Sequence, residues 1–163
     1  AGAFESPGSG PLGWVDDLGV HLPLKSGPRS VPFATLELPV DWPQVAILYG
    51  CVDPPLAMIS ALLQAGVKGL VWTGTGAGQL SLVERDALMQ WPGQLPLMLR
   101  ANRCGSGPVH PCDRNDQLGL LPAGSLSPQK ARILLLLALI AGLDRTELSA
   151  LLATMLMTGK NEG

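Results

Sequence analysis

Short apolar runs alternate with longer amphipathic stretches along most of this chain. Four such runs predict strands at residues 45–49, 67–73, 95–100 and 118–122, and residues 70–72 are apolar on both faces, as a parallel sheet covered by helices requires. Helical spacing of apolar positions predicts helices at residues 54–65, 81–90, 128–143 and 144–158. Strands that alternate with helices predict an α/β fold, a small three-layer domain with a four-stranded parallel sheet flanked by helices and joined by right-handed crossovers.

Local signals mark where these helices begin and end. A proline, Pro54 or Pro55, falls in the first turn of the first helix, and Gly66 takes its C-cap position. Ser127 caps a helix that Pro128 opens, and Asp144 with Glu147 makes a start that resembles a capping box. In the helix at 81–90, the spacing predicts an inward face of Leu82, Ala87 and Leu88 and an outward face of Glu84, Arg85 and Asp86.

The first 44 residues have a different character. They hold seven of the fifteen prolines and keep no helical period, so they predict an extended arm. Within it, Trp14 and Val15 enter and Val20 and Leu22 leave a turn around Asp16–Asp17, which predicts a hairpin. A two-stranded hairpin alone is marginally stable, so the arm is expected to pack on another domain or subunit. The expected domains are a linker arm at 1–44 and an α/β domain at 45–163.

The strand at 67–73 runs into three alternating glycines, Gly74, Gly76 and Gly78. They allow a tight turn with positive φ before the next helix. Such a turn lies at the carboxyl edge of a parallel sheet, where α/β domains bind ligands, so residues 75–79 are the first candidates for a small-molecule contact. A glycine-rich connection without any ligand explains the glycines equally well.

Composition excludes several partners. The formal charge of −2 and the pI near 5.6 give no basic footprint for nucleic acid or for an anionic membrane. The longest apolar run, residues 133–141, is far shorter than the roughly 20 residues that a membrane-spanning helix needs. The sequence therefore predicts no nucleic-acid partner and no membrane span, and the run is expected to be a core helix.

Cysteine spacing predicts neither a metal nor a cofactor. Cys104 and Cys112 flank a segment rich in Gly and Pro and could close a small disulfide loop in an exported protein. With His110 they offer three potential metal ligands, but the spacing matches no zinc pattern. Structural or free thiols are favoured. The three cysteines cannot all pair within one chain.

Neither dinucleotide binding nor a complete hydrolase site fits the residues. Gly74 and Gly76 followed by Gln79 do not match G-x-G-x-x-G, and Arg100 is a poor match for a 2′-phosphate. None of the serines lies in a nucleophile elbow (Ser81, Ser106, Ser125 and Ser127), and only His21 and His110 could act as bases. Single loop carboxylates are usually solvated or form turns, and those here are Asp53, Asp113 and Asp116. No nucleophile, base and orienting group assemble within this chain.

Three longer segments nevertheless resemble a known family. GVKGLVWTGTGAGQLS, PLMLRANRCGSGPV and GLLPAGSLSPQKARILLLLAL resemble, in order and spacing, the C-terminal domain of bacterial L-asparaginases and the related glutaminase-asparaginases. SPGSGPLGWV resembles the segment that joins this domain to the catalytic one. The resemblance implies an amidohydrolase whose nucleophilic threonine lies in an N-terminal domain, so no catalytic residue is expected in this chain. It also implies asparagine as substrate and a homo-oligomer.

The resemblance also implies substrate contacts. In the family's extracytoplasmic type, the turn reads G-x-G-N-G-N, and its last Asn reaches a neighbouring subunit's active site to contact the amino-acid end of the substrate. Gln79 matches that Asn, and Ala77 matches the first one. An acidic residue after the third strand meets the α-amino group, and Asp113 or Asp116 is the matching candidate.

Two hypotheses of different class remain. The chain is either the C-terminal domain of an L-asparaginase that acts through a covalent acyl-enzyme, or a stand-alone binding or oligomerisation module with the same fold and no activity. An N-terminal neighbour with the threonine motifs would separate them, and the reading frame upstream of Ala1 would reveal it.

Overall fold

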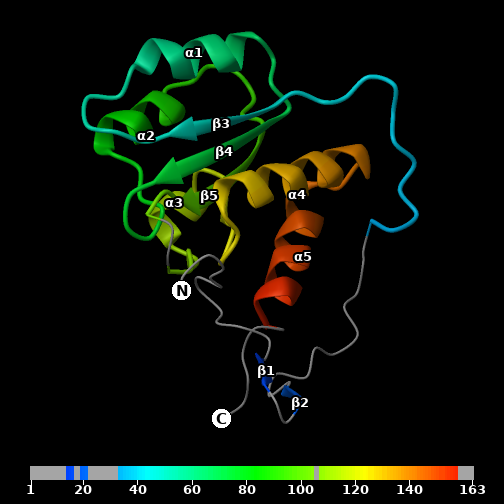
Figure 1. Cartoon of the computed structure of the whole chain (residues 1–163). Helices are drawn as coiled ribbons and strands as arrows, with labels where there is room; N and C mark the ends of the chain where they lie inside the picture. Colours follow the sequence, from blue (N-terminus) through cyan, green and yellow to red (C-terminus); the bar gives the residue numbers. More distant parts are fainter. Residues whose placement is uncertain (1–13, 17–18, 22–32, 105–106, 158–163) are drawn as a thin grey trace. The chain divides into compact units, whose positions relative to one another are not determined.

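A computed structural model describes residues 14–16, 19–21, 33–104 and 107–157 (Figure 1). The chain divides into two units, Ala1–Thr35 and Leu36–Gly163. In the first unit, β1 (Trp14–Asp16) pairs antiparallel with β2 (Gly19–His21), and Val15 lies opposite Val20. This pairing confirms the predicted hairpin. Asp17 and Leu22, which the prediction also used, lie outside the described residues.

The second unit contains a parallel sheet of four strands in the order β3-β4-β5-β6. The strands are β3 (Val45–Tyr49), β4 (Gly69–Gly74), β5 (Leu97–Asn102) and β6 (Leu120–Pro122). The predicted four-stranded parallel sheet is confirmed. β4 and β5 begin two residues later than predicted, because the ladder starts only where Val45 faces Gly69 and Gly69 faces Leu97.

Helices cover both faces of this sheet, as the three-layer prediction requires. α1 (Leu56–Gln64) and α2 (Leu82–Met89) lie on one face, and α4 (Pro128–Ile140) lies on the other (Figure 1). α1 and α2 share a face because their crossovers step through the sheet in the same direction. A four-residue helix, α3 (Asp113–Asp116), precedes β6, and α5 (Arg145–Met157) follows α4.

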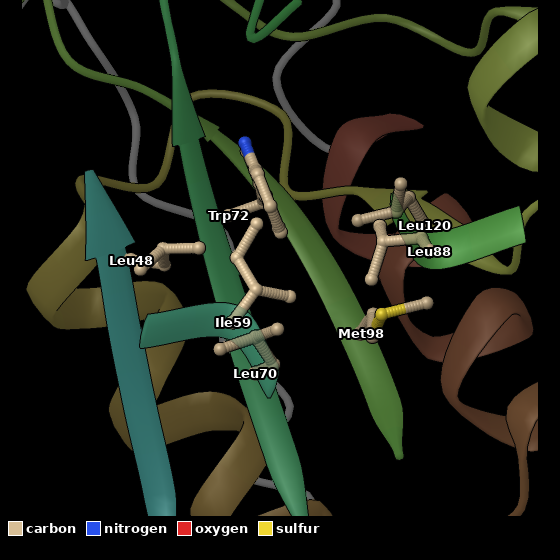
Figure 2. Packing of buried hydrophobic residues seen from close by; sticks show 7 residues of the cluster. All are labelled: Leu48, Ile59, Leu70, Trp72, Leu88, Met98 and Leu120. Atoms are coloured by element: carbon tan, nitrogen blue, oxygen red, sulfur yellow. The ribbon is translucent and has the colours of Figure 1, made fainter. Parts of the chain in front are cut away.

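β4 is the centre of the packing, since all six of its residues are buried. Leu70 and Trp72 point toward α1 and α2, where they meet Ile59 and Leu88 (Figure 2). Gly69 faces α4 instead: a Cβ there would lie 2.9 Å from Leu135 Cδ2. β4 is covered by helices on both faces and therefore needs apolar residues on both, as its sequence predicts.

The helix starts follow the predicted caps. Ser127 Oγ accepts a hydrogen bond from Lys130 N (3.3 Å) and Pro128 is the first residue of α4. Asp144 Oδ1 accepts from Glu147 N (2.8 Å), while Glu147 Oε2 accepts from Asp144 N (2.9 Å), which completes a capping box. α1 begins at Leu56, later than predicted, because a residue before a proline avoids the helical region and Pro54 precedes Pro55.

The predicted faces of α2 are partly wrong. Leu82 is 67% exposed, although its spacing predicted burial, and Glu84 is only 2% exposed, although it was predicted to face solvent. The capping box explains the difference. Glu84 Oε2 accepts from both the backbone N and the Oγ of Ser81 (2.8 Å each), so its carboxylate folds back over the helix start and is buried there with its hydrogen bonds made.

No helix in the described part of the chain is long and apolar enough to cross a membrane. The apolar run at 133–141 falls mostly within α4, whose buried side chains face the sheet.

The two ends of α2 provide a matched test of this packing. We expect Leu88→Ala to lower the free energy of unfolding by about 2–5 kcal/mol, because a fully buried leucine leaves a cavity. Leu82→Ala, the same change on an exposed side chain, is expected to cost less than about 0.5 kcal/mol. Urea unfolding monitored by circular dichroism measures both, and equal losses would contradict the observed orientation of α2.

Candidate functional site

Backbone hydrogen bonds join the connections at the carboxyl edge of the sheet. Gly50 N donates to Thr73 O (2.9 Å), Arg103 N donates to Gly74 O (3.0 Å), and Ala123 N donates to Arg100 O (2.9 Å). Arg103 Nη1 also donates to Gly50 O. The ends of neighbouring strands are therefore fixed to one another, and side chains that project from this edge start from a rigid base.

The glycine-rich turn at 74–79 is closed by a hydrogen bond from Gln79 N to Thr75 O (3.0 Å). Gly78 combines φ +73° with a buried position against β5, where a Cβ would lie 3.0 Å from Ala101 O. Gly74 is needed for a different reason than the predicted positive φ: a Cβ there would lie 2.3 Å from Gln79 O, so any side chain would collide with the returning backbone.

Arg100 lies fully buried beneath this turn. Its Nη1 donates to Ala77 O (2.9 Å) and its Nη2 donates to His110 O (2.7 Å). Nη2 is also 3.6 Å from Asp116 Oδ1. These contacts occupy the guanidinium within the protein, which argues against the alternative in which Arg100 meets a 2′-phosphate. One side chain instead links the turn to the segment before β6.

That segment contains α3, which the sequence predicted as part of a loop at 101–116. Asp116 Oδ2 accepts from Cys112 N (2.9 Å), and Arg145 Nη2 donates to Asp116 O (2.6 Å), so the short helix is held at both ends. Asn115 in its middle is 1% exposed. Its Nδ2 donates to Gln79 Oε1 (3.1 Å), 36 residues away in sequence.

The structure thus places two of the three predicted substrate-binding residues in one short helix and brings the third against it. Gln79 is exposed on the turn and contacts α3 through Asn115. Asp113 is exposed at the first position of α3, whereas the carboxylate of Asp116 is held by Cys112 N and faces Arg100. Sequence reasoning missed Asn115, and no local signal marks it, because its partner belongs to a different βα connection.

Other polar candidates have structural tasks or stay apart. Ser81 and Ser127 are helix caps. Cys51, Cys104 and Cys112 are free thiols, which agrees with the favoured prediction rather than with a disulfide between Cys104 and Cys112. Within residues 33–104 and 107–157, and in the described hairpin, no three His, Cys, Asp or Glu side chains gather as metal ligands. The polar groups that this edge exposes include the amide of Gln79 on the turn and the carboxylate of Asp113 on α3.

Comparison with known proteins matches this architecture to one family. Residues 44–152 match the model of the glutaminase/asparaginase C-terminal domain. The chain is 32% identical over 141 residues to the probable periplasmic L-asparaginase of Haemophilus influenzae, an alignment covering 83% of this chain and 40% of that protein. It is 36% identical over 110 residues to L-asparaginase 2 of Bacillus subtilis, covering 68% of this chain and 29% of that protein.

A solved structure agrees with these relatives. The crystal structure of a probable cytoplasmic L-asparaginase from Campylobacter jejuni superposes with a TM-score of 0.78 at 30% identity. The superposition covers 93% of this chain and 47% of that one. The chain therefore spans less than half the length of the relatives it matches.

Two glycines of the turn test its geometry. Gly74→Ala is expected to destabilise the protein more than Gly76→Ala, because the new methyl group collides with backbone at position 74 but meets nothing within 4 Å at position 76. For Gly76→Ala, the only expected cost is that of placing an alanine at φ +53°, which lowers the free energy of unfolding by about 1–2 kcal/mol. Thermal unfolding ranks the two variants, and a greater loss for Gly76→Ala would contradict the close approach of Gln79 O to Gly74.

Proposed function

This chain belongs to the glutaminase/asparaginase family, whose C-terminal domain it contains, and from that premise we propose that it is the C-terminal part of an L-asparaginase. The proposed reaction hydrolyses the side-chain amide of L-asparagine to L-aspartate and ammonia. The family match over residues 44–152 is the observation that carries the proposal. The turn at 74–79, set at the carboxyl edge of the sheet, supports it.

The chemical step is assigned to an N-terminal domain that precedes this one. There a threonine hydroxyl would attack the amide carbon, ammonia would leave with a proton, and water would then hydrolyse the acyl-enzyme. Two of the serines in this chain, Ser81 and Ser127, are occupied as helix caps. The contribution of this chain is to bind and orient the substrate, which lowers the barrier by holding the reacting groups together.

Gln79 is the proposed substrate contact. It is exposed at the tip of a rigid turn, and its side chain is held by α3 rather than by its own turn. For the α-amino group of the substrate, Asp113 is the better candidate of the two carboxylates. Asp113 is exposed, whereas Asp116 accepts a backbone hydrogen bond and lies 3.6 Å from the guanidinium of Arg100.

The proposed partners are the N-terminal catalytic domain and further copies of the chain in a homo-oligomer. Such contacts are supported by the apolar side chains that α1 and α2 expose, because exposed apolar surface is often covered by another protein surface. They are Leu56, Met58, Leu82, Val83 and Met89. A stand-alone module without activity would use the same surfaces, and the reading frame upstream of Ala1 distinguishes the two.

The 163-residue chain by itself is expected not to hydrolyse asparagine. The reason is the missing nucleophile, since a polar clamp alone cannot form an acyl-enzyme. An ammonia-release assay compares this chain with the full-length protein, which is expected to be active. Turnover by the isolated chain that persists through repeated purification would overturn the assignment of the chemistry to another domain.

In the full-length protein, Gln79→Ala is expected to reduce kcat/KM for asparagine about ten- to a hundredfold, the loss of one hydrogen bond to a charged group, roughly 1.5–3 kcal/mol. The fold should remain intact because Gln79 is exposed, although the free energy of unfolding is expected to fall by about 1–3 kcal/mol, since the buried Nδ2 of Asn115 loses this acceptor. Gln90→Ala, at the exposed C-terminal end of α2, is the matched control and should leave the kinetics unchanged. Gln79→Asn tests the reach of the side chain, and kinetics unaltered by either change at position 79 would remove Gln79 from the site.

A further inference from the structure

Asn115 is a buried amide that donates a hydrogen bond to a candidate substrate-binding side chain. It is 1% exposed, and its Nδ2 donates to Gln79 Oε1 at 3.1 Å. Burying an amide is unfavourable unless it is hydrogen-bonded, so this contact has a direct energetic reason to persist. The bond joins two connections of the sheet, the turn after β4 and the helix before β6.

The bond also determines which end of the Gln79 amide remains for a ligand. A glutamine amide has one carbonyl oxygen that accepts and one NH2 group that donates. Asn115 donates to the oxygen, and Gln79 is exposed, so the NH2 group is the end left to meet a substrate. Two N–H donors suit a carboxylate, because hydrogen bonds to a charged acceptor are shorter and stronger than those between neutral groups.

The two segments that carry this bond are both contacted by the guanidinium of Arg100. Arg100 donates to Ala77 O in the turn that carries Gln79, and it lies 3.6 Å from Asp116, the residue after Asn115. Its other backbone contact, to His110 O, fixes the approach to α3. Arg100 is fully buried in β5, and its contacts link the turn and α3 on either side of the Asn115–Gln79 bond.

We propose that Asn115 is a positioning residue, which holds the amide of Gln79 with its NH2 group presented to a carboxylate of the substrate. The proposal rests on the proposed function of the chain as part of an amino-acid amidohydrolase. It deepens that function by naming the group of the substrate that Gln79 recognises and the side chain that orients Gln79. Asn115 acts only through Gln79 and does not itself touch the substrate.

A double-mutant cycle in the full-length protein tests whether Asn115 acts through Gln79. Gln79→Ala and Asn115→Ala are each expected to lower kcat/KM for asparagine about tenfold, mainly by raising KM, and the double variant is expected to lower it by the same factor. Removing Asn115 has no further effect once Gln79 is gone. Independent losses that multiply to about a hundredfold would overturn the proposal, and so would unchanged kinetics in Asn115→Ala.

Gln79→Glu isolates the donor, because its exposed position keeps the fold intact and it retains an oxygen for Asn115 Nδ2. We expect this variant to unfold at the same temperature as the wild type but to bind asparagine at least as weakly as Gln79→Ala. The substitution replaces the NH2 donor with an oxygen, and the resulting carboxylate repels the carboxylate of the substrate. Wild-type KM in Gln79→Glu would overturn the proposal even if every variant of Asn115 failed to fold.

Asn115→Asp and Arg114→Ala complete the test. The aspartate keeps the size of Asn115 but accepts from Gln79 Nε2 instead of donating to Oε1, so KM is expected to rise at least tenfold. Arg114 is exposed in the same helix, and its replacement should leave KM unchanged. If the wild type is active and the Asn115→Asp variant has the same KM as the wild type, the positioning role alone is refuted. A full-length wild type that releases no ammonia from asparagine refutes the proposed function, and this inference with it.

Discussion

The buried guanidinium of Arg100 is the contact on which the carboxyl edge of the sheet depends. A charge with no exposed surface needs partners within the protein: Arg100 donates from its two terminal nitrogens to Ala77 O and His110 O and lies close to Asp116, while its Nε has no hydrogen-bond partner among the described residues. Those three partners belong to the turn after β4, the loop after β5 and the helix α3. One side chain from the middle of the sheet therefore ties together every segment from which the candidate site is built.

The sheet makes this arrangement possible because β4 is buried on both faces. Leu70 and Trp72 fill the layer under α1 and α2, and Gly69 lets α4 approach the opposite face. Because β4 is packed on both faces, the turn that follows it at residues 74–79 has a defined position at the carboxyl edge of the sheet. Gly74 then lets the backbone of residues 78 and 79 return into the space that a Cβ at position 74 would fill, so that Gln79 follows the strand end closely.

The site that results is suited to holding a substrate rather than to attacking it. Its polar groups are an exposed amide, a buried amide that orients it, and carboxylates on a short helix. Rigid binding groups of this kind contribute by orientation, while the covalent step needs a nucleophile supplied elsewhere. This separation fits a chain that spans less than half of its relatives and matches the C-terminal domain of its family.

The sequence by itself determined the elements whose signals are local. The apolar runs of the strands, the caps Ser127 and Asp144 and the positive φ of Gly76 and Gly78 follow from local signals, and the structure confirms them, whereas Gly74 is required for its close approach to Gln79. Tertiary structure decided the rest: the exposure of Leu82, the partners of Arg100, and the pairing of Asn115 with Gln79. Each of these depends on which distant segment lies against the residue. A hydrogen bond between positions 36 residues apart leaves no mark in the spacing of either segment, so only the fold could reveal it.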